Sequence, residues 1–175
     1  MIYTVTFNPS IDYIMFTDGF ELKGLNRAKE TYKFAGGIGI NVSRVLKTLD
    51  VDSTALGFAG GFPGEFISKT LEESKIHTDF IEVDEDTRIN VKLKSGQETE
   101  INAPGPKVTQ DQFQALLTQI KNTTNKDTVI VAGSVPNSIP SDAYAQIAEI
   151  TKNTGAKLVV DAEKALDETE LPYQP

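Results

Sequence analysis

Three glycines lie within four positions at residues 36–39, directly before a segment with the apolar spacing of a helix. Val42, Val45 and Leu49 fall on one face of that helix. A glycine-rich turn lets the backbone approach a ligand without Cβ clashes, and a helix N-terminus points free N–H groups at it. Residues 36–41 are therefore predicted to bind an anion such as phosphate. The alternative is that the glycines only shape a strand-to-helix connection.

Two charged residues stand at the ends of apolar, strand-like segments. Asp12 follows a strand expected at Ile2–Phe7, where a carboxylate could accept hydrogen bonds from ligand hydroxyls. The alternative for Asp12 is an Asx-type turn. Arg88 begins another strand-like segment, where a guanidinium could grip a phosphate through two parallel hydrogen bonds. The alternative for Arg88 is a solvated surface side chain, the usual place for a lone arginine.

Four further polar residues are also candidates for ligand binding. Asn41, in the first helical turn, offers two donors and an acceptor. Ser134 follows a short apolar strand, at the edge where open α/β sheets bind ligands. Lys92 and Asn102 belong to a hairpin that faces the same expected pocket.

Two common nucleotide-binding motifs are missing from the sequence. No Gly-x-x-x-x-Gly-Lys-Ser/Thr run is present, which excludes a P-loop kinase. Gly37-x-Gly39 begins a dinucleotide-binding fingerprint, but its third position falls on Val42 and no acidic residue ends a strand at the required distance. The sequence therefore favours a different mode of phosphate recognition.

Alternating strand-like and helix-like segments predict an α/β fold, with a mostly parallel sheet flanked by helices. The helix near residues 110–122 has a capping box formed by Thr109 and Gln112. The expected strands are Ile2–Phe7, Ser53–Ala59, Thr128–Gly133 and Lys157–Asp161, and the expected helices are Asn41–Leu49, Pro63–Ser74, Gln110–Asn122 and Pro140–Thr154.

A second set of strands falls outside this alternation, within residues 11–34 and 88–102. Ile11–Phe16 is expected to pair with Lys29–Phe34, and Arg88–Lys94 to form a hairpin with Glu98–Asn102. The simplest arrangement is a small antiparallel β lid inserted into the parallel core. The alternative is a hairpin with no functional role.

Several short motifs follow one another in a fixed order: Asn8-Pro9-Ser10-Ile11-Asp12, Gly36-Gly37-Ile38-Gly39-Ile40-Asn41, Gly60-Gly61-Phe62-Pro63-Gly64, Thr87-Arg88-Ile89-Asn90-Val91, Thr99-Glu100-Ile101-Asn102-Ala103-Pro104-Gly105-Pro106 and Val131-Ala132-Gly133-Ser134-Val135-Pro136. Together they resemble the N-terminal half of the ribokinase-like, PfkB-type sugar kinases. The residues of the first and fourth motifs favour the branch that acts on fructose 1-phosphate over the tagatose branch.

The resemblance implies a kinase that uses ATP and Mg²⁺ to phosphorylate the C6 hydroxyl of fructose 1-phosphate. Tagatose 6-phosphate or another phosphosugar is the alternative substrate, and a non-catalytic sugar-phosphate-binding module is a further possibility. The substrate-binding residues implied by the resemblance are Asp12, Gly36, Gly37, Asn41, Arg88, Asn102 and Ser134.

The sequence departs from the family pattern in two ways. Ile38 stands where many members carry a lysine that helps to hold the substrate phosphate. The family's Gly-Ala/Ser-Gly-Asp signature, with the catalytic base, and its Asn-x-x-Glu motif would both lie past residue 175. Residues 1–175 are therefore expected to form the sugar-binding part of one ribokinase-like domain, without the ATP-binding part, without a catalytic residue and inactive alone.

Composition narrows the possible partners. The net charge of −8 gives no electrostatic footprint for nucleic acid or an anionic membrane. The absence of cysteine fits a cytoplasmic location. No metal-ligating cluster is apparent, and the only histidine, His77, is expected in a surface loop with no catalytic part. In the resembling family the lid often supplies a dimer contact, so a homodimer through the lid is expected.

Overall fold

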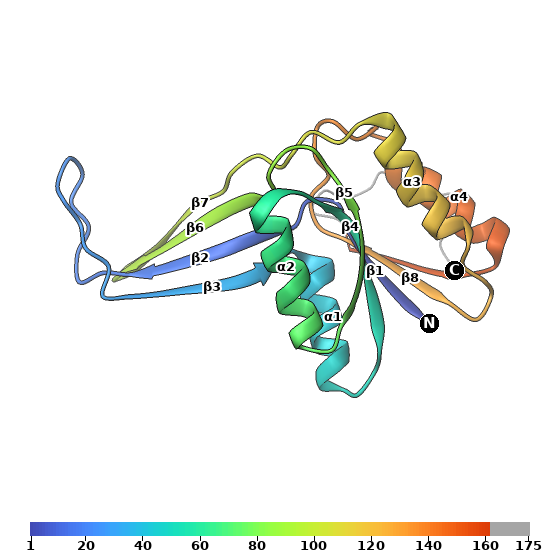
Figure 1. The fold of residues 1–175 in the computed structure, drawn as a ribbon, viewed down its shortest axis with the longest axis horizontal. Coiled ribbons are helices and arrows are strands. Elements are labelled where there is room, and N and C mark those ends of the chain that lie inside the picture. The colour runs from blue at the N-terminus through green and yellow to red at the C-terminus, as the bar shows by residue number, and fades with distance from the viewer. Residues whose placement is uncertain (162–175) are drawn as a thin grey trace.

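The computed structural model describes residues 1–161, which form an α/β body with a lid of strands projecting from it (Figure 1). The strands are β1 (Ile2–Thr6), β2 (Ser10–Phe16), β3 (Glu30–Gly36), β4 (Ser53–Ala59), β5 (His77–Glu82), β6 (Arg88–Ser95), β7 (Gln97–Ile101), β8 (Thr128–Ala132) and β9 (Lys157–Asp161). The helices are α1 (Ile38–Thr48), α2 (Gly61–Glu73), α3 (Gln110–Lys121) and α4 (Ala143–Thr154).

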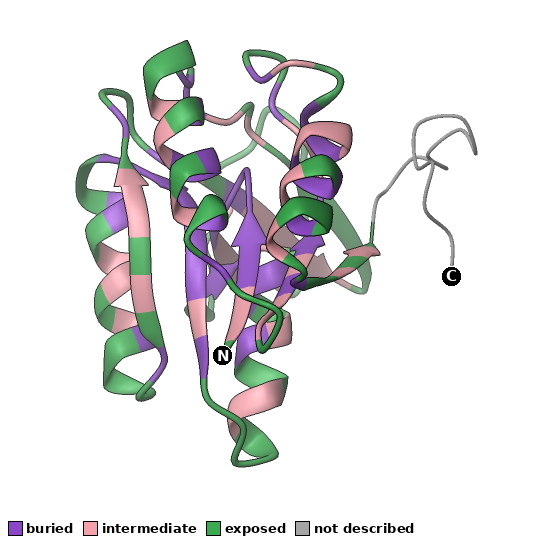
Figure 2. Cartoon of the chain, turned by 90° about the vertical axis from the view of Figure 1, so that its right-hand side faces the viewer, coloured by how far each residue is buried: buried purple, intermediate pink, exposed green. Residues whose placement is uncertain are grey.

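The body is a parallel sheet between two layers of helices, as the sequence predicts. Its strand order is β5-β4-β1-β8-β9, and every neighbouring pair is parallel. Helices α1 and α2 cover one face, while α3 and α4 cover the other (Figure 1). Buried residues gather on the central strands and on the helix surfaces that face them (Figure 2). The sheet is therefore the centre of the hydrophobic core.

Strand β1 presents different chemistry to the two layers. Val5 belongs to the large apolar cluster beneath α3 and α4. On the opposite face the buried Thr4 hydroxyl lies 2.7 Å from Ser43 Oγ of α1. A Cβ at Gly39 would lie 2.5 Å from Thr6 Oγ1 and 2.8 Å from the Val5 carbonyl oxygen. Only glycine allows α1 to pack this closely against β1.

The lid is a mixed sheet of order β3-β2-β6-β7. The β2–β3 and β6–β7 pairs are antiparallel, as expected, but β2 and β6 pair in parallel. The expectation of an antiparallel lid is thus correct for the two hairpin-like pairs and wrong for the pair that joins them. Both central strands leave the body at the carboxyl edge of its sheet, so they run outward side by side.

Strand β5 was not expected. His77 lies at its start and is exposed, so it is on the surface as expected but in a strand and not in a loop. β5 is an edge strand, and only Thr78, Phe80 and Ile81 are partly buried in it. Because its other residues are polar and exposed, residues 77–82 lack the continuous apolar run that marks a central strand.

The largest remaining differences concern helix ends. Helix α1 begins at Ile38, three residues before the expected start, and α4 begins at Ala143, three residues after it. Pro140 lies in a turn before α4, where its carbonyl accepts the amide of Ala143 at 3.0 Å. Within residues 1–161, no helix is long and apolar enough to cross a membrane.

The predicted capping box of α3 is confirmed. Gln112 N donates to Thr109 Oγ1 at 3.3 Å, and Thr109 N donates to Gln112 Oε1 at 2.8 Å. Replacing Thr109 with alanine is expected to lower the free energy of unfolding by about 1 kcal/mol, because a first-turn amide loses its acceptor. Denaturant unfolding followed by circular dichroism measures this loss.

The matched control is Thr118→Ala on the exposed side of the same helix. Its hydroxyl bonds back to the Gln114 carbonyl at 2.9 Å, a contact that brings helices little stability. Alanine there should leave the unfolding free energy unchanged or raise it. Equal stability of Thr109→Ala and the parent chain would contradict the role assigned to the capping box.

Candidate functional site

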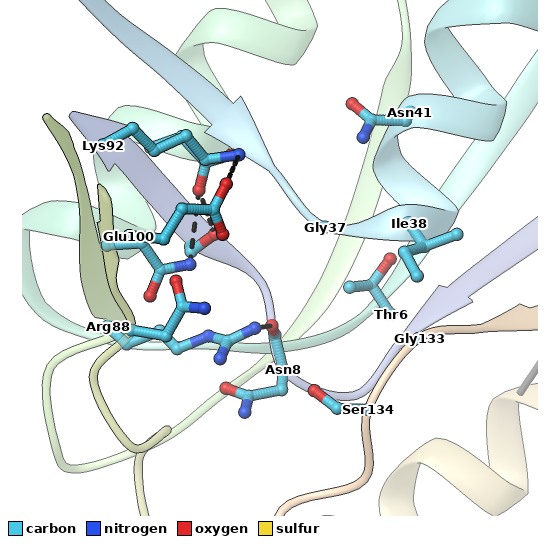
Figure 3. Close-up of a pocket in the computed structure, with 14 residues that line it drawn as sticks. Thr6, Asn8, Gly37, Ile38, Asn41, Arg88, Lys92, Glu100, Gly133 and Ser134 are labelled. Atoms are coloured by element: carbon cyan, nitrogen blue, oxygen red, sulfur yellow. Dashed lines mark hydrogen bonds and ion pairs between the residues drawn. The ribbon is translucent and has the colours of Figure 1, made fainter. Parts of the chain in front are cut away.

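A polar cavity of about 210 Å³ lies where the carboxyl ends of β1 and β8, the start of α1 and the lid meet (Figure 3). Its walls come from segments far apart in the chain, which the fold brings to one edge of the body sheet. The residues that line it are Thr6, Asn8, Ser10, Asp12, Gly37, Ile38, Asn41, Arg88, Asn90, Lys92, Glu100, Asn102, Gly133 and Ser134.

Asp12 is fixed in this cavity by neighbours on two lid strands. Ser10 Oγ donates to Asp12 Oδ1 at 2.8 Å, and Asn90 Nδ2 donates to the same oxygen at 3.3 Å. The other carboxylate oxygen faces Lys92 Nζ at 3.3 Å. The backbone N–H of Ala103 in turn donates to Asn90 Oδ1 at 3.2 Å. The carboxylate is therefore held in one orientation before any ligand binds.

Lys92 lies between two carboxylates. Its ammonium is 3.3 Å from Asp12 Oδ2 and 3.4 Å from Glu100 Oε1. Burial acts to lower the pKa of Lys92, but the charges of Asp12 and Glu100 outweigh burial and raise that pKa above its usual 10.5. The lysine is thus a stable cation at neutral pH.

Arg88 is held by the backbone at the base of the lid. Its Nη2 donates to the Asn8 carbonyl at 3.0 Å, and its Nη1 donates to the Ala103 carbonyl at 3.5 Å. A second cavity of about 370 Å³ adjoins the first, and Asn8, Arg88 and Ser134 line both. The guanidinium therefore stands at the junction of two hollows, where an anionic group of a ligand can reach it.

The start of α1 forms another wall. Gly37 has a φ of 126°, which favours glycine, and it gives α1 no side-chain cap. The first turn also holds no acidic residue. Free N–H groups and the positive end of the helix dipole thus lie beside the cavity, an arrangement that suits an anion. Ile38 contributes an apolar surface to this wall.

Two buried polar atoms of the cavity wall have no protein partner within the described residues. They are Thr6 Oγ1, in a side chain that is 3% exposed, and Asn8 Oδ1, in one that is 8% exposed. Buried polar atoms normally form hydrogen bonds, and each unmade bond costs about 1–3 kcal/mol. A ligand or water in the cavity can satisfy both atoms.

Six of the seven candidate residues from the sequence line the cavity together: Asp12, Gly37, Asn41, Arg88, Asn102 and Ser134. Gly36 does not line it. A Cβ at Gly36 would lie 2.7 Å from Asp12 Oδ1 and 2.8 Å from Ser10 Oγ, so this glycine leaves room for the carboxylate. Its place is behind Asp12 and not at the cavity wall. Ligand binding by these residues stays a prediction.

Sequence reasoning missed several residues of the site, and two signals could have found Asn90 and Glu100. Asn90 alternates with the candidates Arg88 and Lys92 along one strand and shares their face. The hairpin turn at Gly96 sets the cross-strand register, which places Glu100 opposite Lys92. Thr6 and Ser10, which flank the passage into the lid, carry no such signal.

The residues that the structure describes offer no evident place for a metal ion. Within 1–161, no group of three or more His, Cys, Asp or Glu side chains could hold one. We therefore assign no Mg²⁺ or ATP ligand to the described residues.

Comparison with known proteins places the chain among the sugar kinases. The family model for pfkB family carbohydrate kinases matches residues 5–171. The chain thus belongs to the pfkB family of carbohydrate kinases.

Its relatives agree with this assignment. The chain is 51% identical to a 1-phosphofructokinase of Bacillus subtilis over 98% of its own length and 57% of the relative's. It is 46% identical to a 1-phosphofructokinase of Borreliella burgdorferi over 92% and 52% of the two chains. A crystal structure of a candidate phosphofructokinase from Staphylococcus aureus superposes with a TM-score of 0.93 at 77% identity, covering 100% of this chain and 57% of that one. The chain spans little more than half the length of these relatives.

Replacing Gly36 with alanine tests how tightly Asp12 is packed. The new Cβ would collide with Asp12 and Ser10, and we expect a loss of about 1–3 kcal/mol in the free energy of unfolding. Gly19→Ala is the control, since nothing lies within 4 Å of a Cβ there. Denaturant unfolding compares the two variants. Equal stability would show that Asp12 can move aside at no cost.

Proposed function

We propose that this chain is the sugar-binding part of a 1-phosphofructokinase, and that the whole protein transfers the γ-phosphoryl group of ATP to the C6 hydroxyl of fructose 1-phosphate. The observation that carries the proposal is a single polar cavity lined by both an oriented carboxylate, Asp12, and a backbone-anchored guanidinium, Arg88. The relatives at 51% and 46% identity, both named 1-phosphofructokinase, support it.

Each wall of the cavity has a part in binding under this proposal. Asp12 accepts hydrogen bonds from sugar hydroxyls, and Asn41 offers a donor and an acceptor to the same ring. Arg88 and Ser134 hold the substrate's phosphate, supported by the helix N-terminus at Gly37. Phosphoryl transfer depends mainly on alignment and on charge stabilisation, and these residues supply the alignment of the acceptor.

A tagatose phosphate is the second candidate substrate. A D-tagatose-1-phosphate kinase of Bacillus licheniformis is 37% identical over 100% of this chain and 58% of that protein. The higher identity to the 1-phosphofructokinases favours fructose 1-phosphate. A phosphofructokinase-2 of Escherichia coli, solved with fructose-6-phosphate, is 26% identical with a TM-score of 0.87. A binding module without catalysis remains the alternative from a different functional class.

ATP and Mg²⁺ belong to the proposal for the whole protein. Kinases of this family use both, and the nucleotide supplies the phosphoryl group when it is bound. We also propose a cytoplasmic location, supported by the metabolic role of the bacterial relatives.

Binding of phosphosugars to the 175-residue chain tests which of them is the substrate. We expect isothermal titration calorimetry to give tighter binding for fructose 1-phosphate than for tagatose 1-phosphate or fructose 6-phosphate. Asp12→Asn should weaken the preferred ligand roughly 10- to 100-fold, because hydrogen bonds to a charged group are lost. Arg44→Met, on the outer part of α1, is the control and should bind as the parent does.

A coupled assay with ATP and fructose 1-phosphate then tests the reaction on the whole protein. Turnover is expected there and not with the 175-residue chain. Preference for another phosphosugar would show that fructose 1-phosphate is not the substrate. Binding without turnover by the whole protein would favour the non-catalytic module.

A homodimer through the lid is also proposed. Phe16, Tyr32 and Phe34 form a row of aromatic side chains on the lid, and each is at least 38% exposed. Tyr32 packs against Phe16 at 6.0 Å and against Phe34 at 6.4 Å between ring centroids. The strand register places this row on the same lid face as Asp12. Apolar rings gathered on one exposed face suit a protein–protein contact.

Substitution in this row tests the contact. Phe16→Lys is expected to shift the chain towards a monomer in sedimentation velocity, since a charge would be buried in the apolar contact. Val45→Lys, at a 58% exposed apolar position on α1, is the control and should leave the oligomeric state unchanged. A parent chain that is monomeric at all concentrations would overturn the lid contact.

A further inference from the structure

Three charged side chains from three neighbouring lid strands meet at the cavity. Lys92 of β6 lies between Asp12 of β2, at 3.3 Å, and Glu100 of β7, at 3.4 Å (Figure 3). Glu100 is directly opposite Lys92 in the β6–β7 register, whereas Asp12 is diagonal to it, since Lys92 is paired with Ile14 on β2. The lysine therefore leans along the sheet to reach Asp12 and is shared between the two carboxylates.

A neighbouring ion pair on the same hairpin lies outside the cavity and serves as a comparison. Lys94 and Glu98 are paired two register positions further along the same two strands, 2.7 Å apart, and neither lines the cavity. The side chain of Lys92 is 27% exposed and that of Asp12 is 22% exposed, against 38% for Lys94. Partial burial strengthens the interactions of Lys92, while pairs as exposed as Lys94–Glu98 contribute little.

The charges of the cavity wall cancel one another. Among its lining residues, Asp12 and Glu100 are acidic and Arg88 and Lys92 are basic, while the other residues are uncharged. Without Lys92 the wall would be negative, and without Glu100 it would be positive. A phosphorylated ligand brings a charge of about −2. Loss of Lys92 is therefore expected to weaken its binding, and loss of Glu100 to strengthen it.

Lys92 also completes the environment of the Asp12 carboxylate. Ser10 and Asn90 both bind Oδ1, and Lys92 faces Oδ2. These contacts keep Asp12 as an oriented acceptor for sugar hydroxyls. Glu100 lies on the other side of the lysine and competes with Asp12 for its positive charge.

We propose that Lys92 is a positioning residue that orients Asp12 and balances its charge so that the cavity accepts a phosphorylated sugar, and that Glu100 opposes this effect. This inference rests on the proposed function. The ammonium acts through Asp12 and is not a proton acceptor, because it remains charged at neutral pH. Glu100 sets the strength of the effect, since it takes part of the lysine's charge away from the ligand.

The test compares Lys92→Met, Lys92→Arg and Glu100→Gln in the 175-residue chain, with fructose 1-phosphate as the ligand in titration calorimetry. Lys92→Met is expected to weaken binding by roughly tenfold or more, because the wall becomes negative and Asp12 loses a partner. Glu100→Gln is expected to tighten binding by roughly threefold and to make it more sensitive to salt, because the wall becomes positive. Lys92→Arg should recover most of the affinity.

Matched controls come from the neighbouring pair. Lys94→Met and Glu98→Gln make the same chemical changes on the same strands outside the cavity, and both should bind as the parent does. Thermal unfolding of every variant confirms that the chain is folded. Should Lys92→Met fail to fold, tighter and more salt-sensitive binding by Glu100→Gln, together with near-parent binding by Lys92→Arg, still decides the question.

The two proposals fail in different ways. Parent-like affinity of Lys92→Met, or weaker binding in both Lys92→Met and Glu100→Gln, would overturn this inference, because a purely structural role weakens both. Equal losses in the Lys94 and Glu98 controls would also overturn it. A parent chain that binds no phosphosugar would overturn the proposed function, and with it this inference.

Discussion

The close approach of α1 to β1 is the constraint on which the cavity depends. Gly39 lies where any side chain would collide with Thr6 and with the backbone of Val5. Since the helix cannot be moved outward without opening the core, its first turn is held at the carboxyl end of β1. Ile38 then packs beside Gly133 at the end of β8, at 3.6 Å from the position of a Cβ there. One steric contact thus brings together the helix terminus and two strand ends.

The passage from body to lid is short and buried, which fixes the two parts relative to each other. The residues between β1 and β2 are Phe7, Asn8 and Pro9, and all are buried. Phe7 stacks on Phe58 at 6.4 Å and meets Tyr144 edge-on at 5.7 Å. Since the Asn8 carbonyl also binds Arg88, the first residue of β6 is tied to the same buried segment.

Much of the body could be predicted from the sequence because its signals are local. The apolar runs of β8 and β9 and the capping box at Thr109 each reveal an element without reference to the rest of the chain. β5 could not be found this way, because its pairing with β4 decides its structure while its own residues are mostly polar. The parallel pairing of β2 with β6 joins segments nearly 80 residues apart and has no local signal.

The same contrast between local and long-range signals applies to the residues of the site. The sequence identified Asp12, Arg88 and Asn41 through a resemblance that covers the chain, and the structure brings them to one cavity. Gly36, which the sequence also named, does not line the cavity but leaves room for Asp12, and such crowding by a side chain is visible only in three dimensions. Glu100 faces Lys92 through the cross-strand register that the hairpin turn sets, which the motifs by themselves do not contain.

The uneven burial of the lid has a consequence for its hydrogen exchange. Ile11 and Ala35 join the core at the base of the lid, but further out β2 and β3 bury no apolar side chain, and all of β7 is exposed. Strands with so little buried surface open locally without unfolding the body, so slow amide exchange should stop at the base of the lid. The cavity wall from the body and the cavity wall from the lid then open independently of each other. A ligand that contacts both walls would make the two parts open together.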